Sequence, residues 1–208
     1  MNSSVTVSSA EPRDPASLAA ADALAADPFY QAISEPFAAD PVRRRTVLAD
    51  YFTCSIAEGA RDGRVVHSPA PADGVAVWLL PQAATAEARA TALKHAALQE
   101  ILGPEGFATY RGIVRFMSDQ SAGIVADDAW YLSILAVAPA SQGQGLGRQL
   151  LAPTLAAADG AGVPCYLETF TPRTLAFYER LGFMTHRVIA EPTTRSDYAI
   201  MIRDARRS

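Results

Sequence analysis

The stretch SQGQGLGRQLL, residues 141–151, places three glycines directly before a leucine-rich run. Glycine loses more conformational freedom on folding than any other residue, so this placement needs a physical reason. At the start of a helix the backbone N–H groups have no intrahelical partner and the helix dipole is positive, so an anion such as a phosphate can bind there. The glycines therefore predict an anion-binding loop, with an ordinary turn into a helix as the alternative.

The spacing of the glycines excludes two familiar phosphate-binding loops. The stretch has no G-x-x-x-x-G-K-[ST] pattern, which excludes a P-loop. The order Gly143-x-Gly145-x-Gly147 does not fit G-x-G-x-x-G, and the stretch lies late in the chain, which disfavours a dinucleotide site. Arg148 adds a positive charge to the first turn of the expected helix.

The composition restricts the class of protein. Half of the 208 residues are hydrophobic, which suits a single domain over 16–208 after a loose Ser- and Pro-containing segment at 1–15. The formal net charge of -4 gives no basic surface for a nucleic-acid partner. No apolar run approaches about 18 residues and the N-terminus lacks a secretion signal, so we expect no membrane partner and a cytoplasmic location. Cys54 and Cys165 have no second cysteine nearby, so we expect no metal site.

Hydrophobic periodicity and the positions of proline and glycine predict a mixed α/β order with a crossover helix between two late strands. We expect helices over 16–27, 41–59, 85–101, 104–118, from the glycine loop to about 159, and 172–181. We expect strands over 64–68, 75–81, 129–139, 163–170, 183–190 and 197–204.

A second stretch, LETFTPRTLAFYERLGF at 167–183, runs from a strand into a short helix. Thr171 suits the N-cap, Pro172 the first helical position and Gly182 the position after the helix end. Tyr178 lies one turn beyond Leu175 and can project toward the end of the strand. A packed core aromatic is the alternative explanation for this tyrosine.

Together the two stretches resemble the GCN5-related N-acetyltransferase (GNAT) superfamily. The run from Gln142 to Gly147 is similar to the family signature Q/R-x-x-G-x-G/A, and FYERLGF at 177–183 is similar to the last family helix. The resemblance covers about 64–203, and 167–183 with DGVAVWLLP upstream further resembles the puromycin N-acetyltransferase branch. The resemblance implies a mixed, mostly antiparallel central sheet with splayed central strands and helices on both faces.

The resemblance also implies where acetyl-CoA binds. Its place is a gap between the strands at 130–138 and 164–170, with the pyrophosphate on the glycine loop and the pantetheine arm along the first strand. The N–H of Val137 is then the candidate to polarise the thioester carbonyl. The cofactor-binding residues implied in this way are Leu135, Val137, Gln142, Gly143, Gln144, Gly145, Gly147 and Arg148.

Two residues are candidates for catalysis. Glu168 sits late in its strand beside the gap and could take a proton from the acceptor amine, although a solvated or ion-paired carboxylate is the alternative. Tyr178 could donate a proton to the leaving thiolate. Two departures from the family pattern matter: Thr171 stands where many members have Asn, and the strand at 130–138 carries no carboxylate.

The resulting hypothesis is direct transfer of an acetyl group from acetyl-CoA to a primary amine of a small, antibiotic- or nucleoside-like molecule. Two alternatives remain: a non-catalytic acyl-CoA-binding sensor or interaction module, and an acyltransferase that uses another acyl-CoA. The sequence leaves homodimerisation open and does not identify the acceptor.

Overall fold

The computed structural model describes residues 13–206, so most of the segment expected to be loose, 1–15, lies outside the described residues. The helices are α1 (Pro15–Leu24), α2 (Pro28–Ile33), α3 (Pro41–Asp62), α4 (Ala84–Ser121), α5 (Leu146–Ala161) and α6 (Leu175–Glu179). The strands are β1 (Gly63–His67), β2 (Gly74–Leu79), β3 (Trp130–Val137), β4 (Cys165–Thr169), β5 (Met184–Glu191) and β6 (Ser196–Arg203).

The six strands form one sheet in the order β1-β2-β3-β4-β6-β5. Only the β3–β4 pair is parallel, because α5 crosses over between these two strands, and the other four pairs are antiparallel. This arrangement confirms the expected mixed α/β class with a mostly antiparallel sheet.

The central strands β3 and β4 pair over only three positions. Their registered partners are Trp130 with Cys165, Tyr131 with Tyr166 and Leu132 with Leu167, after which the pairing stops. Each strand keeps its other neighbour: β3 pairs with β2 as far as Val137, and β4 pairs with β6 along its whole length. The strands therefore separate toward their carboxyl ends while the sheet stays continuous on both sides, which confirms the splayed centre.

A β-bulge at Ser133 marks the point of separation. Val77 of β2 pairs with Ile134 of β3, whereas the next residue of β2 pairs with Leu132, so Ser133 has no partner across the ladder. Side chains two apart in a strand normally share a face, yet Leu132 joins one hydrophobic core and Ile134 joins the other. The bulge thus reverses which side of the sheet the alternate side chains of β3 point to, at the position where the pairing with β4 ends.

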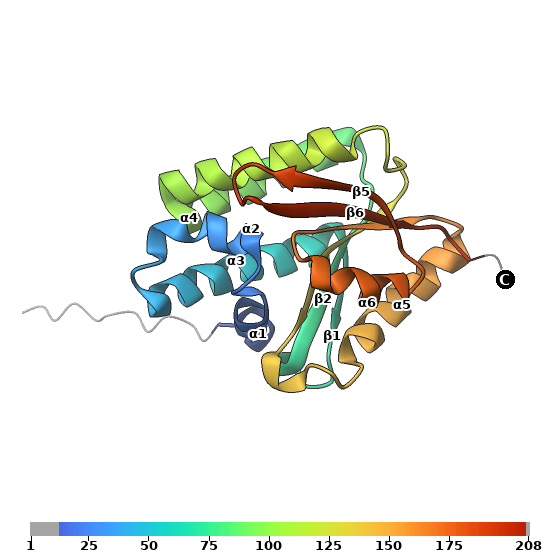
Figure 1. Cartoon of the computed structure of the whole chain (residues 1–208), viewed down its shortest axis with the longest axis horizontal. Helices are drawn as coiled ribbons and strands as arrows, with labels where there is room; N and C mark the ends of the chain where they lie inside the picture. The colour runs from blue at the N-terminus through green and yellow to red at the C-terminus, as the bar shows by residue number, and fades with distance from the viewer. Residues whose placement is uncertain (1–12, 207–208) are drawn as a thin grey trace, which may run out of the picture.

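Two layers of helices cover the sheet (Figure 1). Helices α1 to α4 enclose the larger core on one face, with α3 packed against both α1 and α4. Helices α5 and α6 cover the other face, where Leu150, Leu151 and Leu155 pack against Trp78. Burying each such side chain contributes about 1.5–3 kcal/mol, so both layers hold the splayed sheet in place. None of the helices in the described part is both long and apolar enough to cross a membrane.

The expected order differs from the structure near α6 and α2. The two helices expected at 85–101 and 104–118 are both present, because the element labelled α4 is divided at Gly103, whose φ of 67° and ψ of 177° are not helical, before Pro104. The helix expected at 172–181 is shorter: a 3₁₀ turn over Pro172–Thr174 precedes α6. Helix α2 was missed because it has only six residues, although Asp27 before Pro28 is a typical N-cap pair.

An ion pair ties α5 to the end of β6. The guanidinium of Arg203, only 3% exposed, donates two hydrogen bonds to the carboxylate of Asp159, at 2.8 and 2.7 Å. Hydrogen bonding from Arg203 lowers the pKa of Asp159 to about 2. The pair therefore stabilises the fold above the ordinary aspartate pKa, and this stabilisation is lost as the pH falls toward 2.

We expect Asp159→Asn to lower the free energy of unfolding by about 1.5–3 kcal/mol at pH 7, because the buried guanidinium loses its charged partner. Asp22→Asn, which breaks an exposed pair with Arg45, is the control and should cost less than about 1 kcal/mol. Urea unfolding at pH 7 and pH 3 measures both effects. Equal losses for the two variants at pH 7 would show that the buried pair does not stabilise the fold.

Candidate active site

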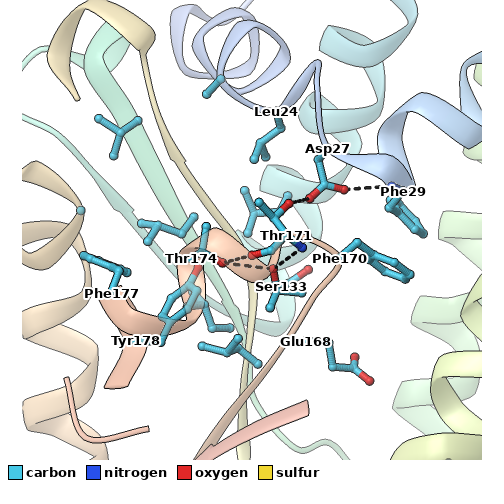
Figure 2. Close-up of a pocket in the computed structure, with 18 of the residues that line it drawn as sticks. Leu24, Asp27, Phe29, Ser133, Glu168, Phe170, Thr171, Thr174, Phe177 and Tyr178 are labelled. Atoms are coloured by element: carbon cyan, nitrogen blue, oxygen red, sulfur yellow. Dashed lines mark hydrogen bonds between the residues drawn. The ribbon is translucent and has the colours of Figure 1, made fainter. Parts of the chain in front are cut away.

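A cavity of about 1090 Å³ occupies the gap between β3 and β4 (Figure 2). Its lining includes Tyr30, Tyr51 and Phe170 from the core under α1 to α4. It also includes Phe177 and Tyr178, which pack against the core on the α5 side. The cavity therefore joins the two faces of the sheet through the place where the strands separate, and a ligand entering from one face can meet a ligand from the other.

The glycine loop forms one end of this cavity. Gly143 and Gly145 have φ of 77° and 79°, in the left-handed region where a side chain is strained. Gly145 is the residue before the first turn of α5, whose initial N–H groups have no intrahelical partner. Among the described residues, no backbone bond uses the N–H of Gln144, Gly145 or Gly147. The loop thus presents several free N–H donors and the positive end of a 16-residue helix.

The third glycine has a different role. A Cβ atom added to Gly147 would lie 3.2 Å from Cζ of Phe177 and 3.8 Å from a methyl group of Leu135. Gly147 therefore lets the first turn of α5 pack closely against α6 and β3. This contact links the position of the loop to the position of Tyr178, the residue after Phe177.

The free edge of β3 forms the second wall. The N–H of Ala138 donates to Asp73 on the β2 side, at 2.8 Å. Backbone groups alternate in direction along a strand, so the N–H and C=O groups of Val137 and Leu135 point toward the gap. The side-chain amide of Gln142 donates to the carbonyl of Val137 at 3.0 Å, in agreement with this direction. β3 can therefore accept an extended ligand as a further strand.

Glu168 lies on the α3–α4 face of β4, late in the strand. Its carboxylate accepts a hydrogen bond from the hydroxyl of Tyr198 on β6. Burial raises the pKa of Glu168, while the hydroxyl groups of Tyr198 and Tyr131 partly offset the increase. Glu168 forms no ion pair with a described lysine or arginine, so the structure replaces the ion-paired alternative by a half-buried carboxylate that accepts a hydrogen bond from a hydroxyl group.

Tyr178 reaches the cavity from α6, on the opposite face from Glu168 (Figure 2). Its ring packs edge-on against Phe177 and Phe183, with centroids 5.0 and 5.9 Å apart. Burial raises the pKa of its hydroxyl, and the charge of Asp27 adds to this increase. The hydroxyl therefore stays protonated, but it is a weaker acid than the unperturbed phenol that the sequence argument assumes.

Asp27 is a site residue that sequence analysis missed. One carboxylate oxygen caps α2 by accepting from the N–H of Phe29 at 2.9 Å, and the other accepts from the hydroxyl of Thr171 at 2.7 Å. Burial raises the pKa of Asp27 despite these two bonds. The expected N-cap role of Thr171 is wrong in one respect, because its side chain makes no cap bond and binds Asp27 instead (Figure 2).

Aromatic rings line the remaining part of the cavity, beside α2, α3 and α4. Phe29 packs against Tyr30 at 5.1 Å and against Phe170 at 5.8 Å, measured between ring centroids. Beyond these rings, the ammonium of Lys94 pairs with the carboxylate of Glu58 at 2.5 Å, with both side chains nearly buried. The other rings that line this part are Tyr51 and Tyr110.

The structure brings the predicted site residues together with one exception. Gln144 does not line the cavity, and its side-chain amide donates to the carbonyl of Ala140 at 3.3 Å. The predicted residues that do line it are Leu135, Val137, Gln142, Gly143, Gly145, Gly147, Arg148, Glu168 and Tyr178. Within the described residues, no three His, Cys, Asp or Glu side chains are grouped so as to hold a metal ion.

Residues 104–185, which include the glycine loop, β4 and α6, match the family model described as Acetyltransferase (GNAT) domain. This part of the chain is therefore similar to a GNAT acetyltransferase domain. An uncharacterized N-acetyltransferase of Schizosaccharomyces pombe is 32% identical over 80 residues, which are 38% of this chain and 32% of that protein. The match thus spans about a third of the length of this curated relative.

Two solved structures share the fold of this chain. A Corynebacterium glutamicum protein described as histone acetyltransferase HPA2 and related acetyltransferase has a TM-score of 0.64 and 21% identity, over 93% of this chain and 91% of that one. Arylalkylamine N-acetyltransferase 2 from Aedes aegypti has a TM-score of 0.57 and 16% identity, over 91% and 94% of the two chains. At these identities the likeness establishes the shared architecture alone.

We expect Gly145→Glu to weaken strongly the binding of an anionic ligand such as coenzyme A at this loop, because the new carboxylate would repel an anion at the start of α5. Gly145→Ala is the matched control: it adds a similar backbone strain of about 1–2 kcal/mol at positive φ without the charge. Calorimetry with coenzyme A should find clearly weaker binding for Glu than for Ala. Equal affinities for the two variants would contradict an anion site at this loop.

Proposed function

We propose that the protein is an N-acetyltransferase that moves the acetyl group of acetyl-CoA directly to a primary amine of a small molecule. The observation that carries this proposal is the free backbone edge of β3 beside the unpaired N–H groups of the glycine loop, both in one cavity that reaches the opposite face of the sheet. Such an edge suits an extended amide-containing arm, and such a loop suits a pyrophosphate.

The residues present fit coenzyme A as the donor. Gly145 and Gly147 supply N–H donors at the pyrophosphate, with Gln142, Gly143, Gln144 and Arg148 around them. Leu135 and Val137 pair with the pantetheine arm through their backbone groups, and the N–H of Val137 polarises the thioester carbonyl. When bound, acetyl-CoA supplies the activated acetyl group.

Two side chains move protons in the proposed reaction. A protonated amine has no lone pair, so Glu168 takes one proton from the acceptor before its nitrogen forms the bond to the acetyl carbon. Tyr178 would donate a proton to the sulfur as the carbon–sulfur bond breaks, which leaves a free thiol. The second proton on the nitrogen would then pass to the phenolate of Tyr178, which leaves a neutral amide, and Glu168 would release its proton to solvent. Because burial raises the pKa of Tyr178, its contribution falls at the lower end of the roughly 10²–10⁴-fold range of positioned acids.

The small-molecule acceptor is part of the proposal. The cavity runs between the sheet and α1 to α4, and its aromatic lining is suited to a compact apolar group. The resemblance of 167–183 to the puromycin N-acetyltransferase branch favours the same class. A non-catalytic acyl-CoA-binding module would release no thiol with any amine, and a different acyl donor would give faster turnover than acetyl-CoA. Comparing thiol release from acetyl-CoA with release from propionyl-CoA and succinyl-CoA therefore separates all three.

The test measures thiol released from acetyl-CoA with a panel of primary amines. Release that requires an amine supports the proposal, and none with any amine contradicts it.

Glu168→Gln should lower kcat/KM by about 10²–10⁴-fold, because the amide cannot accept the proton. Because its pKa is raised, Glu168 becomes protonated at pH values above the ordinary glutamate pKa of about 4.3. The wild-type rate should therefore fall as the pH decreases through this range. This inflection should be missing in Glu168→Gln.

Two further variants are measured in the same assay, one as a control for Glu168→Gln and one to test the proton donor. Glu179→Gln changes an exposed carboxylate of α6 that does not line the cavity, and it should leave the rate and the pH profile unchanged. Tyr178→Phe should lower kcat at every pH without weakening coenzyme A binding, because only the hydroxyl proton is lost. A Glu168→Gln enzyme with the wild-type pH profile would remove Glu168 from the mechanism.

A further inference from the structure

Asp27 has no role in the proposed reaction, yet it is a carboxylate that lines the reaction cavity. It comes from the junction of α1 and α2, 144 positions before Thr171, whose hydroxyl it accepts. Its hydrogen bonds from Phe29 and Thr171 use one lone pair on each oxygen, and an ionised carboxylate can accept about four hydrogen bonds. Asp27 therefore retains capacity for donors from a ligand in the cavity.

The charge of Asp27 is poorly compensated. Among the described residues no lysine or arginine forms an ion pair with Asp27. The charge of Arg173 lowers the pKa of Asp27, but it is the smallest of the influences on this pKa. Taking a carboxylate out of water is costly unless it is paired, so a cationic ligand beside Asp27 gains the interaction that the protein does not supply.

Aromatic rings line the same cavity as this carboxylate. Phe29 follows two residues later, and its ring packs against those of Tyr30 and Phe170. Aromatic faces attract cations and also bury flat apolar groups, so the rings and the carboxylate together suit an ammonium attached to a ring.

Asp27 lines the same cavity as Tyr178 and Glu168. Its charge is among the causes that raise the pKa of Tyr30 and of Tyr178, so its carboxylate acts on groups from both faces of the sheet. An ammonium held by Asp27 therefore lies in the cavity where the proposed transfer takes place.

We propose that Asp27 is an acceptor-binding residue, and that it holds the ammonium group of an aromatic amine within the ring-lined part of the cavity. This inference rests on the proposed function, because it names the class of acceptor. Asp27 sets the affinity for the charged acceptor, and Glu168 removes the proton. The bond from Thr171 fixes the direction of the carboxylate.

The test uses two ligands of the same size and different charge. Benzylamine is cationic at pH 7 and phenylhydrazine is neutral there, and both carry a two-atom group on a phenyl ring. Calorimetry on the full chain, without acetyl-CoA, measures their binding directly. Asp27→Asn keeps an oxygen for the N–H of Phe29 and removes the charge, and it should weaken benzylamine by about 10–100-fold while phenylhydrazine changes by less than about 3-fold.

Two controls make each outcome decisive. Thr171→Val breaks the bond to Asp27 but keeps its charge, and it should weaken benzylamine less than Asp27→Asn does. Butylamine, which has the charge without the ring, should bind wild type more weakly than benzylamine. The inference is overturned if Asp27→Asn weakens both phenyl ligands equally, if it weakens neither, if butylamine binds as well as benzylamine, or if wild type binds no amine.

Failure of this inference and failure of the proposed function give different results. The calorimetric measurement requires no turnover, so it reports on Asp27 even if no acetyl group is transferred. Thiol release with amines that do not depend on Asp27 would keep the proposed function and remove this acceptor class. In steady-state assays Asp27→Asn should raise KM for benzylamine by about the same factor and leave kcat nearly unchanged, a separation that a merely structural role would not produce.

Discussion

The interruption of backbone pairing between β3 and β4 is the constraint on which the site depends. Three registered pairs hold the strands together, and beyond Leu132 and Leu167 each strand is held only from its outer side. An unpaired strand edge in the middle of a sheet leaves N–H and C=O groups unsatisfied, which is costly unless a ligand or water pairs with them. The fold tolerates this gap because β2 and β6 fix the two strands and the helical layers bury both outer faces.

The bulge at Ser133 gives the gap its shape. By inserting one unpaired residue it exchanges the faces of β3, so that Ile134 and Ala136 face the α3–α4 core while Leu132 faces α5. It also sets which backbone groups of β3 point into the gap, and these include the N–H of Val137. A sheet that remained paired at this point would have no passage between the glycine loop and the aromatic lining.

Sequence patterns predicted the parts of the site that are local. The glycine loop and the final helix could be recognised because a left-handed backbone at Gly143 and Gly145, and again at Gly182, leaves a signature in residue type. Element boundaries followed from proline and glycine, and the break at Gly103 separates the two helices expected over 85–101 and 104–118. Glu168 and Tyr178 were placed correctly in the cavity, whereas their proton-transfer roles remain predictions.

Other parts depend on contacts that no local pattern encodes. Asp27 and Thr171 meet across 144 positions, and the N-cap signature of Asp27 explains only one of its two bonds. The bulge at Ser133 follows from the register with β2, and a serine in an apolar strand does not predict it. The weakened acidity of Tyr178 results from burial within the assembled fold, so this hydroxyl is a weaker acid than the residue type alone predicts.

The central claim is that the edge of β3 and the glycine loop form one coenzyme A site, and backbone NMR tests it most directly. On titration of ¹⁵N-labelled protein with coenzyme A, the amide signals of Leu135, Val137, Gly145 and Gly147 should shift most. The edge strand β5, which lies outside the cavity, should shift least. Shifts concentrated away from these four amides, or no shifts at millimolar coenzyme A, would contradict the account.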